Sequence, residues 1–247
     1  MPISAIIQAR MASSRLPGKV VFPLNGLPVL KHNIRRAYSA SIVDEVVVAT
    51  TFHERDDLIA EYATEEDATV YRGSEDDVLG RLYRASKETG DEAVIRLTGD
   101  NPLIPPELID EVGKSVLKNC SDYASNKIER TFPLGADAEA LTVESLAAVH
   151  QETRDPYHRE HATKYFRERE TEFETQNITV TDVYGESITG FNPEIRLTLD
   201  EVADYKLFSK LYEEIPYGTV LDVRDAVEFI LENDLQNINR HIDQKTL

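Results

Sequence analysis

The chain has 247 residues, of which 45 are acidic and 27 are basic, and its formal net charge is −18. A chain of this length forms one or two domains and buries a core that needs no cross-links, and its single cysteine excludes a disulfide framework and a multi-thiolate metal site. The acidic surplus argues against nonspecific binding to nucleic acid or to an anionic membrane.

The first half of the chain alternates short apolar runs with helical patterns. We expect strands at 3–8, 45–50, 69–71 and 93–97, and helices at 28–40, 56–64, 76–89 and 106–118. This alternation is typical of βαβ units and predicts an α/β fold with a mostly parallel sheet flanked by helices. Because the strands are apolar throughout, both faces of the sheet should be covered.

From about residue 120 the pattern becomes mixed. We expect strands at 122–125, 140–143, 178–180 and 194–199, and helices at 143–151, 158–170, 202–213 and 223–233. We interpret 1–247 as a single domain with an inserted α+β segment at about 124–190. Cys120 is expected to be a small core residue. No run is long and apolar enough for a membrane span or a secretory signal, so we expect a cytoplasmic protein.

Ligands of open α/β sheets bind beyond the carboxyl ends of the strands, which directs attention to the loop after Gln8. Residues 1–43 contain no acidic residue, and Arg10, Arg15 and Lys19 gather in this loop. Arginine and lysine side chains bind phosphate oxygens. The loop matches neither a P-loop nor a dinucleotide-binding motif. We expect it to hold a small anionic ligand; the alternative is a solvated basic loop.

The run from Arg10 to Lys19, Arg-x-x-x-x-Arg-Leu-Pro-Gly-Lys, resembles the amino-terminal motif of the cytidylyltransferases that activate acidic sugars, such as CMP-acylneuraminate and CMP-ketodeoxyoctonate synthetases. The runs 71–79, 96–104 and 196–200 are similar to the spore coat polysaccharide biosynthesis branch of that family. The resemblance implies a Rossmann-like sheet of the nucleotide-diphospho-sugar transferase type. It also implies a homodimer formed through the inserted segment.

The resemblance further implies a reaction in which a sugar hydroxyl attacks the α-phosphate of CTP and pyrophosphate leaves. Arg10, Arg15 and Lys19 would be catalytic, because they would hold the triphosphate and offset the charge on the leaving pyrophosphate. The nucleotide would be framed by the following residues: Gln8, Ala9, Arg72, Ser74 and Thr98.

Two aspartates follow predicted strands at the same edge of the sheet. Asp100 lies in the run Gly-Asp-Asn-Pro, and Asp200 follows 194–199. Nucleoside triphosphates bind with Mg²⁺, which takes one or two carboxylates besides phosphate oxygens and water. Asp100 and Asp200 are therefore the expected magnesium ligands. Their alternative roles are a turn residue for Asp100 and a helix N-cap for Asp200.

An acceptor pocket is expected within the inserted segment. Asp137 and Glu139 end a Gly/Pro loop, and we expect their carboxylates to accept hydrogen bonds from sugar hydroxyls. Arg159 or His161 would pair with a sugar carboxylate. His158 and His161 are three residues apart and share a helix face, so a metal pair is an alternative, as is a solvated helix face.

The partners expected from these observations are CTP and an acidic sugar or sugar phosphate. One competing reading is a glycosyltransferase that uses a nucleotide sugar, but the Asp-x-Asp element that such enzymes use for metal is absent, the nearest run being 137–139. A second is a nucleotide-binding module without catalysis. A third is the same reaction on a neutral sugar phosphate or with another nucleotide.

Overall fold

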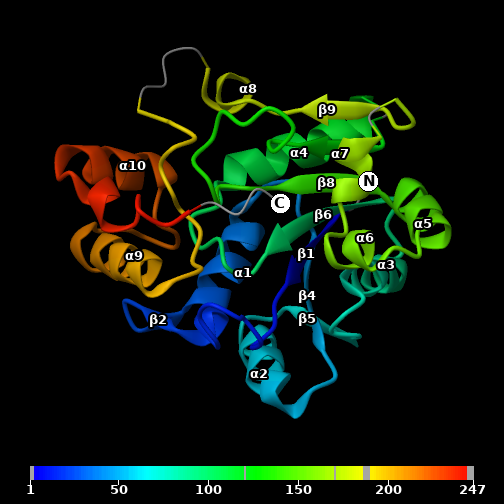
Figure 1. Ribbon diagram of the computed structural model, residues 1–247, viewed down its shortest axis with the longest axis horizontal. Helices are drawn as coiled ribbons and strands as arrows, with labels where there is room; N and C mark the ends of the chain where they lie inside the picture. Colours follow the sequence, from blue (N-terminus) through cyan, green and yellow to red (C-terminus); the bar gives the residue numbers. More distant parts are fainter. Residues whose placement is uncertain (1–2, 120, 170, 186–189, 244–247) are drawn as a thin grey trace.

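The computed structural model describes residues 3–119, 121–169, 171–185 and 190–243 (Figure 1). A central sheet is formed by β1 (Ser4–Gln8), β4 (Glu45–Thr51), β5 (Thr69–Gly73), β6 (Ala93–Thr98), β7 (Tyr123–Ser125), β8 (Glu139–Thr142) and β9 (Thr175–Asn177). Its strand order is β5-β4-β1-β6-β8-β7-β9. A separate small hairpin pairs β2 (Pro23–Leu24) with β3 (Leu27–Pro28). Cys120 lies outside the described residues.

The sheet is mostly parallel, as predicted. β1 pairs in parallel with both β4 and β6, and β4 pairs in parallel with β5. β8 is antiparallel to β6 and to β7, whereas β7 and β9 are parallel. The strands from the segment 124–190 therefore extend the main sheet on its β6 side, and β9 forms an edge.

Helices cover both faces of this sheet. They are α1 (Val29–Ser39), α2 (Asp57–Glu65), α3 (Val78–Thr89), α4 (Pro106–Asn119), α5 (Val143–Glu152), α6 (Pro156–Glu160), α7 (Lys164–Glu168), α8 (Val180–Tyr184), α9 (Val202–Glu214) and α10 (Val223–Glu232), with 3₁₀ turns at Lys19–Val21, Glu54–Asp56 and Leu235–Ile238. No helix in the described ranges combines the length and apolar character that a membrane crossing needs.

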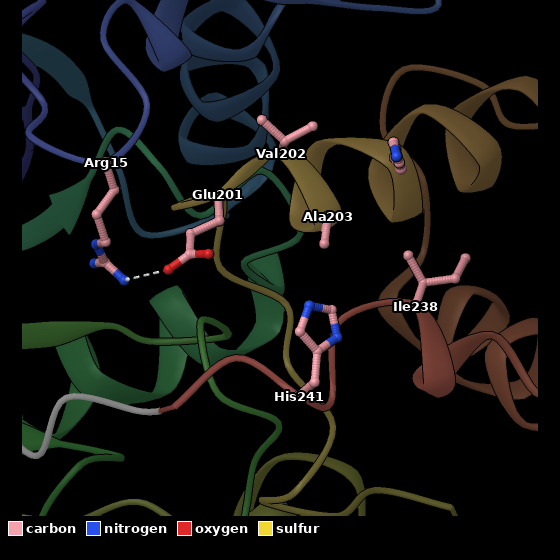
Figure 2. A pocket seen from close by; sticks show the side chains of 7 residues that line it. Arg15, Glu201, Val202, Ala203, Ile238 and His241 are labelled. Atoms are coloured by element: carbon pink, nitrogen blue, oxygen red, sulfur yellow. Dashed lines mark ion pairs between the residues drawn. The ribbon is translucent and has the colours of Figure 1, made fainter.

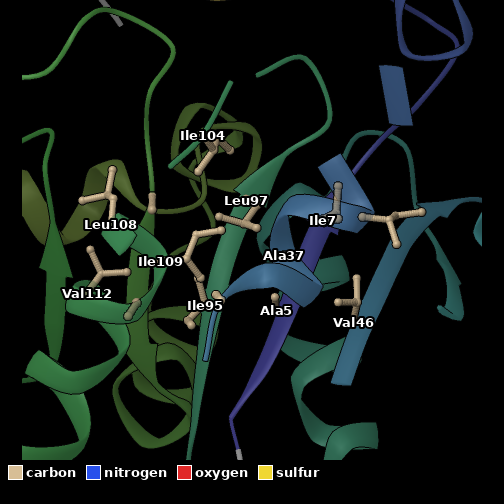
Figure 3. Packing of buried hydrophobic residues seen from close by; sticks show 14 of the residues in the cluster. Ala5, Ile7, Ala37, Val46, Ile95, Leu97, Ile104, Leu108, Ile109 and Val112 are labelled. Atoms are coloured by element: carbon tan, nitrogen blue, oxygen red, sulfur yellow. The ribbon is translucent and has the colours of Figure 1, made fainter. Parts of the chain in front are cut away.

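The core has two main layers because strand side chains alternate between faces. Ala5 and Ile7 of β1 pack in one cluster with α1, α2 and α4, and Figure 3 shows Ile95 next to Ala5 and Leu108 at the far side of the same cluster. Ile6 packs on the opposite face with α3, α5 and α7. A third cluster joins α9 and α10, which lie together at one end of the molecule (Figure 1).

Two predicted elements of the segment 124–190 are wrong in detail. The strand predicted at 178–180 lies at Thr175–Asn177, and Val180 begins α8 because Thr179 forms a capping box with Asp182. The helix predicted at 158–170 is divided into α6 and α7, with a break at 161–163. Its last predicted residue, Glu170, lies outside the described residues.

The strand predicted at 194–199 is also wrong. This segment begins in a turn, closed by the Ile195 N–H and the Asn192 carbonyl, and makes a single bridge, between Leu134 and Arg196. The Leu197 N–H donates to the Leu134 carbonyl at 2.6 Å, and the Leu199 N–H donates to the Asp100 carbonyl at 2.8 Å. The apolar residues that suggested a strand are buried against α9 and α10 instead of within the sheet. The segment nevertheless brings residue 200 to the carboxyl end of β6.

Candidate active site

The loops after β1 and β6 meet at the carboxyl edge of the parallel strands. Gln8 and Thr98 are register partners at the ends of these strands. The Gly99 N–H donates to the Gln8 carbonyl at 2.9 Å. A Cβ at Gly99 would lie 3.1 Å from the Cβ of Ala9 and 3.2 Å from the Gln8 carbonyl oxygen, so the close approach of the two loops favours glycine here.

Lys19 connects the two aspartates that the sequence singled out. Its Nζ lies 2.5 Å from Asp100 Oδ2 and 2.7 Å from Asp200 Oδ1. Lys19 begins a short 3₁₀ turn and is 8% exposed, although it is a lysine. It follows Gly18, whose φ of 74° turns the chain inward. The fold thus gathers one cation and two carboxylates from three loops distant in sequence.

Electrostatics keeps Lys19 and Asp100 charged. Burial lowers the pKa of Lys19, but Asp100 and Asp200 outweigh burial and leave it raised. Burial raises the pKa of Asp100, yet the nearby Lys19 ammonium leaves it lowered. The carboxylate of Asp100 is therefore anionic at neutral pH, and it shares one ammonium with Asp200.

The donor set of this centre fits a magnesium ion that arrives with phosphate. Asp100 and Asp200 offer hard oxygen ligands that face one point, now held by Lys19 Nζ. Within the described ranges, no three His, Cys, Asp or Glu side chains gather as a metal group. Mg²⁺ is commonly held by one or two carboxylates, with substrate oxygens and water completing its shell. Two protein ligands therefore suit a metal–nucleotide complex.

Arg15 and Arg10 leave the first loop in different directions. Arg15 Nη2 lies 2.9 Å from Asp200 Oδ2 and Arg15 Nη1 lies 4.0 Å from Glu201. Arg10 Nη1 instead donates to the Glu75 carbonyl at 3.3 Å, on the loop that leads into α3. Arg15 and Lys19 thus belong to the aspartate centre, whereas Arg10 contacts the loop before α3.

A cavity of about 670 Å³ adjoins Arg15. In Figure 2, Arg15 and Glu201 point toward one another on one wall, and His241 faces them from the C-terminal segment. The lining residues are Arg15, Glu201, Val202, Ala203, Lys206, Ile238 and His241. Three basic side chains and one carboxylate therefore border open space beside the aspartate centre.

The predicted nucleotide residues lie along the same edge of the sheet. The Gln8 amide donates to the Val78 carbonyl at 3.4 Å, which links β1 to the start of α3. Ser74 Oγ accepts from the Asp77 N–H at 3.3 Å in the loop before that helix. Arg72, at the end of β5, donates to the Thr51 carbonyl at 3.1 Å. Gln8, Ala9 and Thr98 therefore lie beside the aspartate centre, whereas Arg72 and Ser74 lie on β5, two strands away from β1, and on the loop that follows β5.

Arg96 is a partly buried residue of the site region to which the sequence reasoning gave no role. Its Nε donates to Gln8 Oε1 at 2.8 Å, and its Nη1 forms an ion pair with Glu139. The Tyr123 hydroxyl donates to Glu139 at 2.5 Å, and Lys127 Nζ lies 3.5 Å away. Burial opposes ionisation of Glu139, but Lys127 and Arg96 hold its pKa well below the usual range. The one feature of the sequence that could have indicated this role is an arginine within an otherwise apolar strand.

The remaining predicted acceptor residues lie in separate contacts. Asp137 forms an ion pair with Arg130. Arg159 Nη2 donates to Asp77 Oδ2 at 2.7 Å, at the N-terminus of α3. Burial lowers the pKa of His161. No hydrogen bond or ion pair of the described residues joins these four predicted residues directly, but Asp137 and Glu139 both act on the pKa of Lys127. His158 lies 2.8 Å from Glu168 Oε2.

Comparison with known proteins places these features in a family. Residues 4–222 match the family model described as Cytidylyltransferase. The chain is 36% identical to an uncharacterised protein of Methanocaldococcus jannaschii, covering 100% of this chain and 98% of that protein. It is 33% identical to the spore coat polysaccharide biosynthesis protein SpsF of Bacillus subtilis, covering 85% of each.

Solved structures that resemble this chain include a cytidylyltransferase. A cytidylyltransferase from Leptospira borgpetersenii is 29% identical and superimposes with a TM-score of 0.86, covering 99% of both chains. The CMP:2-keto-3-deoxy-manno-octonic acid synthetase complexed with CTP is 18% identical, with a TM-score of 0.64, and covers 87% of this chain and 100% of that one. The second likeness is one of fold, and it agrees with the Rossmann-like nucleotidyltransferase architecture predicted from the sequence.

Proposed function

The chain belongs to the cytidylyltransferase family, and we propose that it transfers CMP from CTP to an acidic sugar of the 3-deoxy-ulosonic type, with release of pyrophosphate. The observation that carries this proposal is the convergence of Lys19, Arg15, Asp100 and Asp200 at the carboxyl edge of the sheet. Such a centre suits phosphoryl-type transfer, which depends on positioning and charge neutralisation.

Asp100 and Asp200 would hold the Mg²⁺ that accompanies CTP. Bound there, the ion supplies Lewis-acid polarisation of a phosphoryl oxygen. Lys19 and Arg15 now neutralise these carboxylates, and we propose that both turn toward the triphosphate when the metal and CTP bind. Their charges then offset the negative charge that develops on pyrophosphate. Arg10 approaches the triphosphate from the side of Glu75, where it is 35% exposed at the side chain.

We propose that the backbone at Gln8 and Ala9, with Thr98, Arg72 and Ser74, frames the cytidine. The contact between the loops after β1 and β6 supports this assignment, because it makes a fixed floor beside the aspartate centre. Gln8 is held from both ends of its amide, by Val78 and by Arg96. A side chain held in this way presents a defined edge to a ligand.

The acceptor would lie beyond β6, toward Glu139 and α6. Glu139 is 2% exposed and already accepts from Tyr123 and Arg96, so we propose that it acts by holding Arg96 and Lys127. Those cations suit the carboxylate of an acidic sugar. Arg159, His161 and Asp137 remain our candidates for the outer wall of the acceptor pocket.

We further propose a cytoplasmic homodimer that associates through the segment 124–190. The strand β9 supports the dimer proposal, since it is a sheet edge that pairs with β7 alone among the described strands. An unpaired edge is a ready surface for association. Light scattering, with β9 variants as controls, would measure the oligomeric state.

The reaction is tested by measuring pyrophosphate release from CTP and Mg²⁺ with a panel of ulosonic acids and sugar phosphates. We expect release with at least one ulosonic acid. Release with sugar phosphates alone would show that the acceptor is a sugar phosphate and not an acidic sugar. CTP binding by calorimetry without turnover of any acceptor would favour a binding module, and cleavage of a nucleotide sugar in place of CTP would favour a glycosyltransferase.

A further inference from the structure

A buried polar network lies behind Asp200, on the side away from Lys19. We infer that Arg196, Asp204 and Asn239, which we call the Asp200 support, are positioning residues that hold this carboxylate in its metal-binding orientation. The inference rests on the proposed function, in which Asp200 is a metal ligand. All three side chains are nearly inaccessible, at 4%, 0% and 1% exposed respectively. They come from the segment before α9, from α9 itself and from the residue after the 3₁₀ turn Leu235–Ile238.

Asp204 is the centre of the support. Its Oδ1 accepts from Arg196 Nε at 2.9 Å and from Asn239 Nδ2 at 2.9 Å. Its Oδ2 accepts from the backbone N–H groups of Asp200 at 3.0 Å and Glu201 at 2.9 Å, and from Arg196 Nη2 at 3.2 Å. One buried carboxylate thereby fixes both the backbone of Asp200 and the guanidinium beside it.

The two oxygens of Asp200 have different partners. Oδ2 accepts from Arg196 Nη2 at 3.1 Å, whereas Oδ1 faces Lys19 Nζ at 2.7 Å. Arg15 also contacts Oδ2, but its side chain is 30% exposed and is assigned to the triphosphate. Arg196 is the partner that remains when Arg15 and Lys19 turn to substrate. It anchors one oxygen and leaves the other directed at the metal position.

A helix cap alone does not require this arrangement. Asp204 completes a capping box with Glu201 at the start of α9, and that role needs no buried arginine. Burying a charged pair is costly unless every group is satisfied. Asn239 supplies further hydrogen bonds to this pair, because it donates to Asp204 and, at 3.0 Å, to the Arg196 carbonyl. Partners of this kind orient metal ligands and raise metal affinity.

The test measures binding of Mn²⁺, a paramagnetic substitute for Mg²⁺, to the full chain in the presence of CTP by electron paramagnetic resonance. We expect Arg196→Lys, which cannot bridge Asp204 and Asp200, to weaken Mn²⁺ binding by about tenfold or more. Asn239→Ala removes the hydrogen bonds to Asp204 and to the Arg196 carbonyl. Only the first acts on the carboxylate that orients Asp200, so binding should weaken by about threefold to tenfold, the equivalent of one hydrogen bond. The matched control is Arg36→Met, another buried arginine, which donates to the carbonyls of Ile104 and Leu221 away from Asp200.

The control should lower the thermal midpoint and leave Mn²⁺ affinity unchanged. Equal Mn²⁺ affinity in wild type and in folded Arg196→Lys would overturn the inference and leave the proposed function standing. If Arg196→Lys does not fold, Asn239→Ala decides in the same way. A wild-type protein that binds no Mn²⁺ with CTP and releases no pyrophosphate would instead remove the proposed function.

Discussion

Replacing Lys19 by methionine removes the one ammonium shared by Asp100 and Asp200. In the absence of metal, the two carboxylates then face each other with less compensation, although Asp200 keeps Arg15 and Arg196. We expect the variant to be less stable than the wild type in metal-free buffer. We also expect Mg²⁺ to restore more stability to the variant than to the wild type, because the ion no longer competes with an internal cation.

The structure gives the size of this effect. Breaking a fully buried ion pair costs about 3–5 kcal/mol. The side chains of Asp100 and Asp200 are 26% and 15% exposed, so we reduce the expected loss to about 2–4 kcal/mol. For a chain of this length, that loss lowers the thermal midpoint by about 5–15 °C. Mg²⁺ at about one hundred times its dissociation constant would return about 2.7 kcal/mol.

Thermal unfolding with and without Mg²⁺ measures both effects, with Lys31→Met as the control. Lys31 is paired with Glu65 and Glu66 at the C-terminal end of α2, outside the site, and its replacement should cost less than about 1 kcal/mol without changing the response to Mg²⁺. Equal stability of Lys19→Met and wild type, or an equal response of both to Mg²⁺, would refute the reasoning.

Three further predictions concern stability. Burial lowers the pKa of His32 to about 4, so between pH 6.5 and about 4 the unfolded chain binds a proton that the folded chain does not. The free energy of unfolding should therefore drop by about 3 kcal/mol as the pH falls over that range. In acid titrations followed by circular dichroism, His32→Gln should lack this pH-dependent loss. Leu108→Ala should cost about 2–5 kcal/mol in urea unfolding, because Leu108 is fully buried between α4 and the sheet; a loss below about 1 kcal/mol would contradict this packing. Asp77→Ala removes the side chain that caps α3 at Gly80 and pairs with Arg159; a loss of about 1 kcal/mol or more is expected, and unchanged urea midpoints would argue against the cap.

Much of the site could be predicted because strand ends are local features. Apolar runs ending at Gln8 and Leu97 place Ala9 and Asp100 at one edge of a parallel sheet, and the structure confirms this placement. The position of Asp200 at this edge was also predicted, although the segment before it is not a strand. Leu197 and Leu199 are buried against α9 and α10, and burial against helices produces the same apolar pattern as burial in a sheet.

The role of Arg96 required information that no local pattern contains. Its partner Glu139 lies opposite it because β8 runs antiparallel to β6, and this register depends on the path of the whole segment between them. The predicted position of the last edge strand failed for a different, local reason. There, the capping chemistry of Thr179 and Asp182 outweighed the β-branched pattern around Ile178.

The most direct test of the account is ³¹P nuclear magnetic resonance of CTP and Mg²⁺ with the ulosonic acid panel. It would compare wild type with Asp100→Asn and Asp200→Asn. The account predicts signals of pyrophosphate and of a new sugar phosphodiester with the wild type, and a rate lower by about 10²–10³ or more in each variant. Formation of both products at an undiminished rate in the two variants would contradict it.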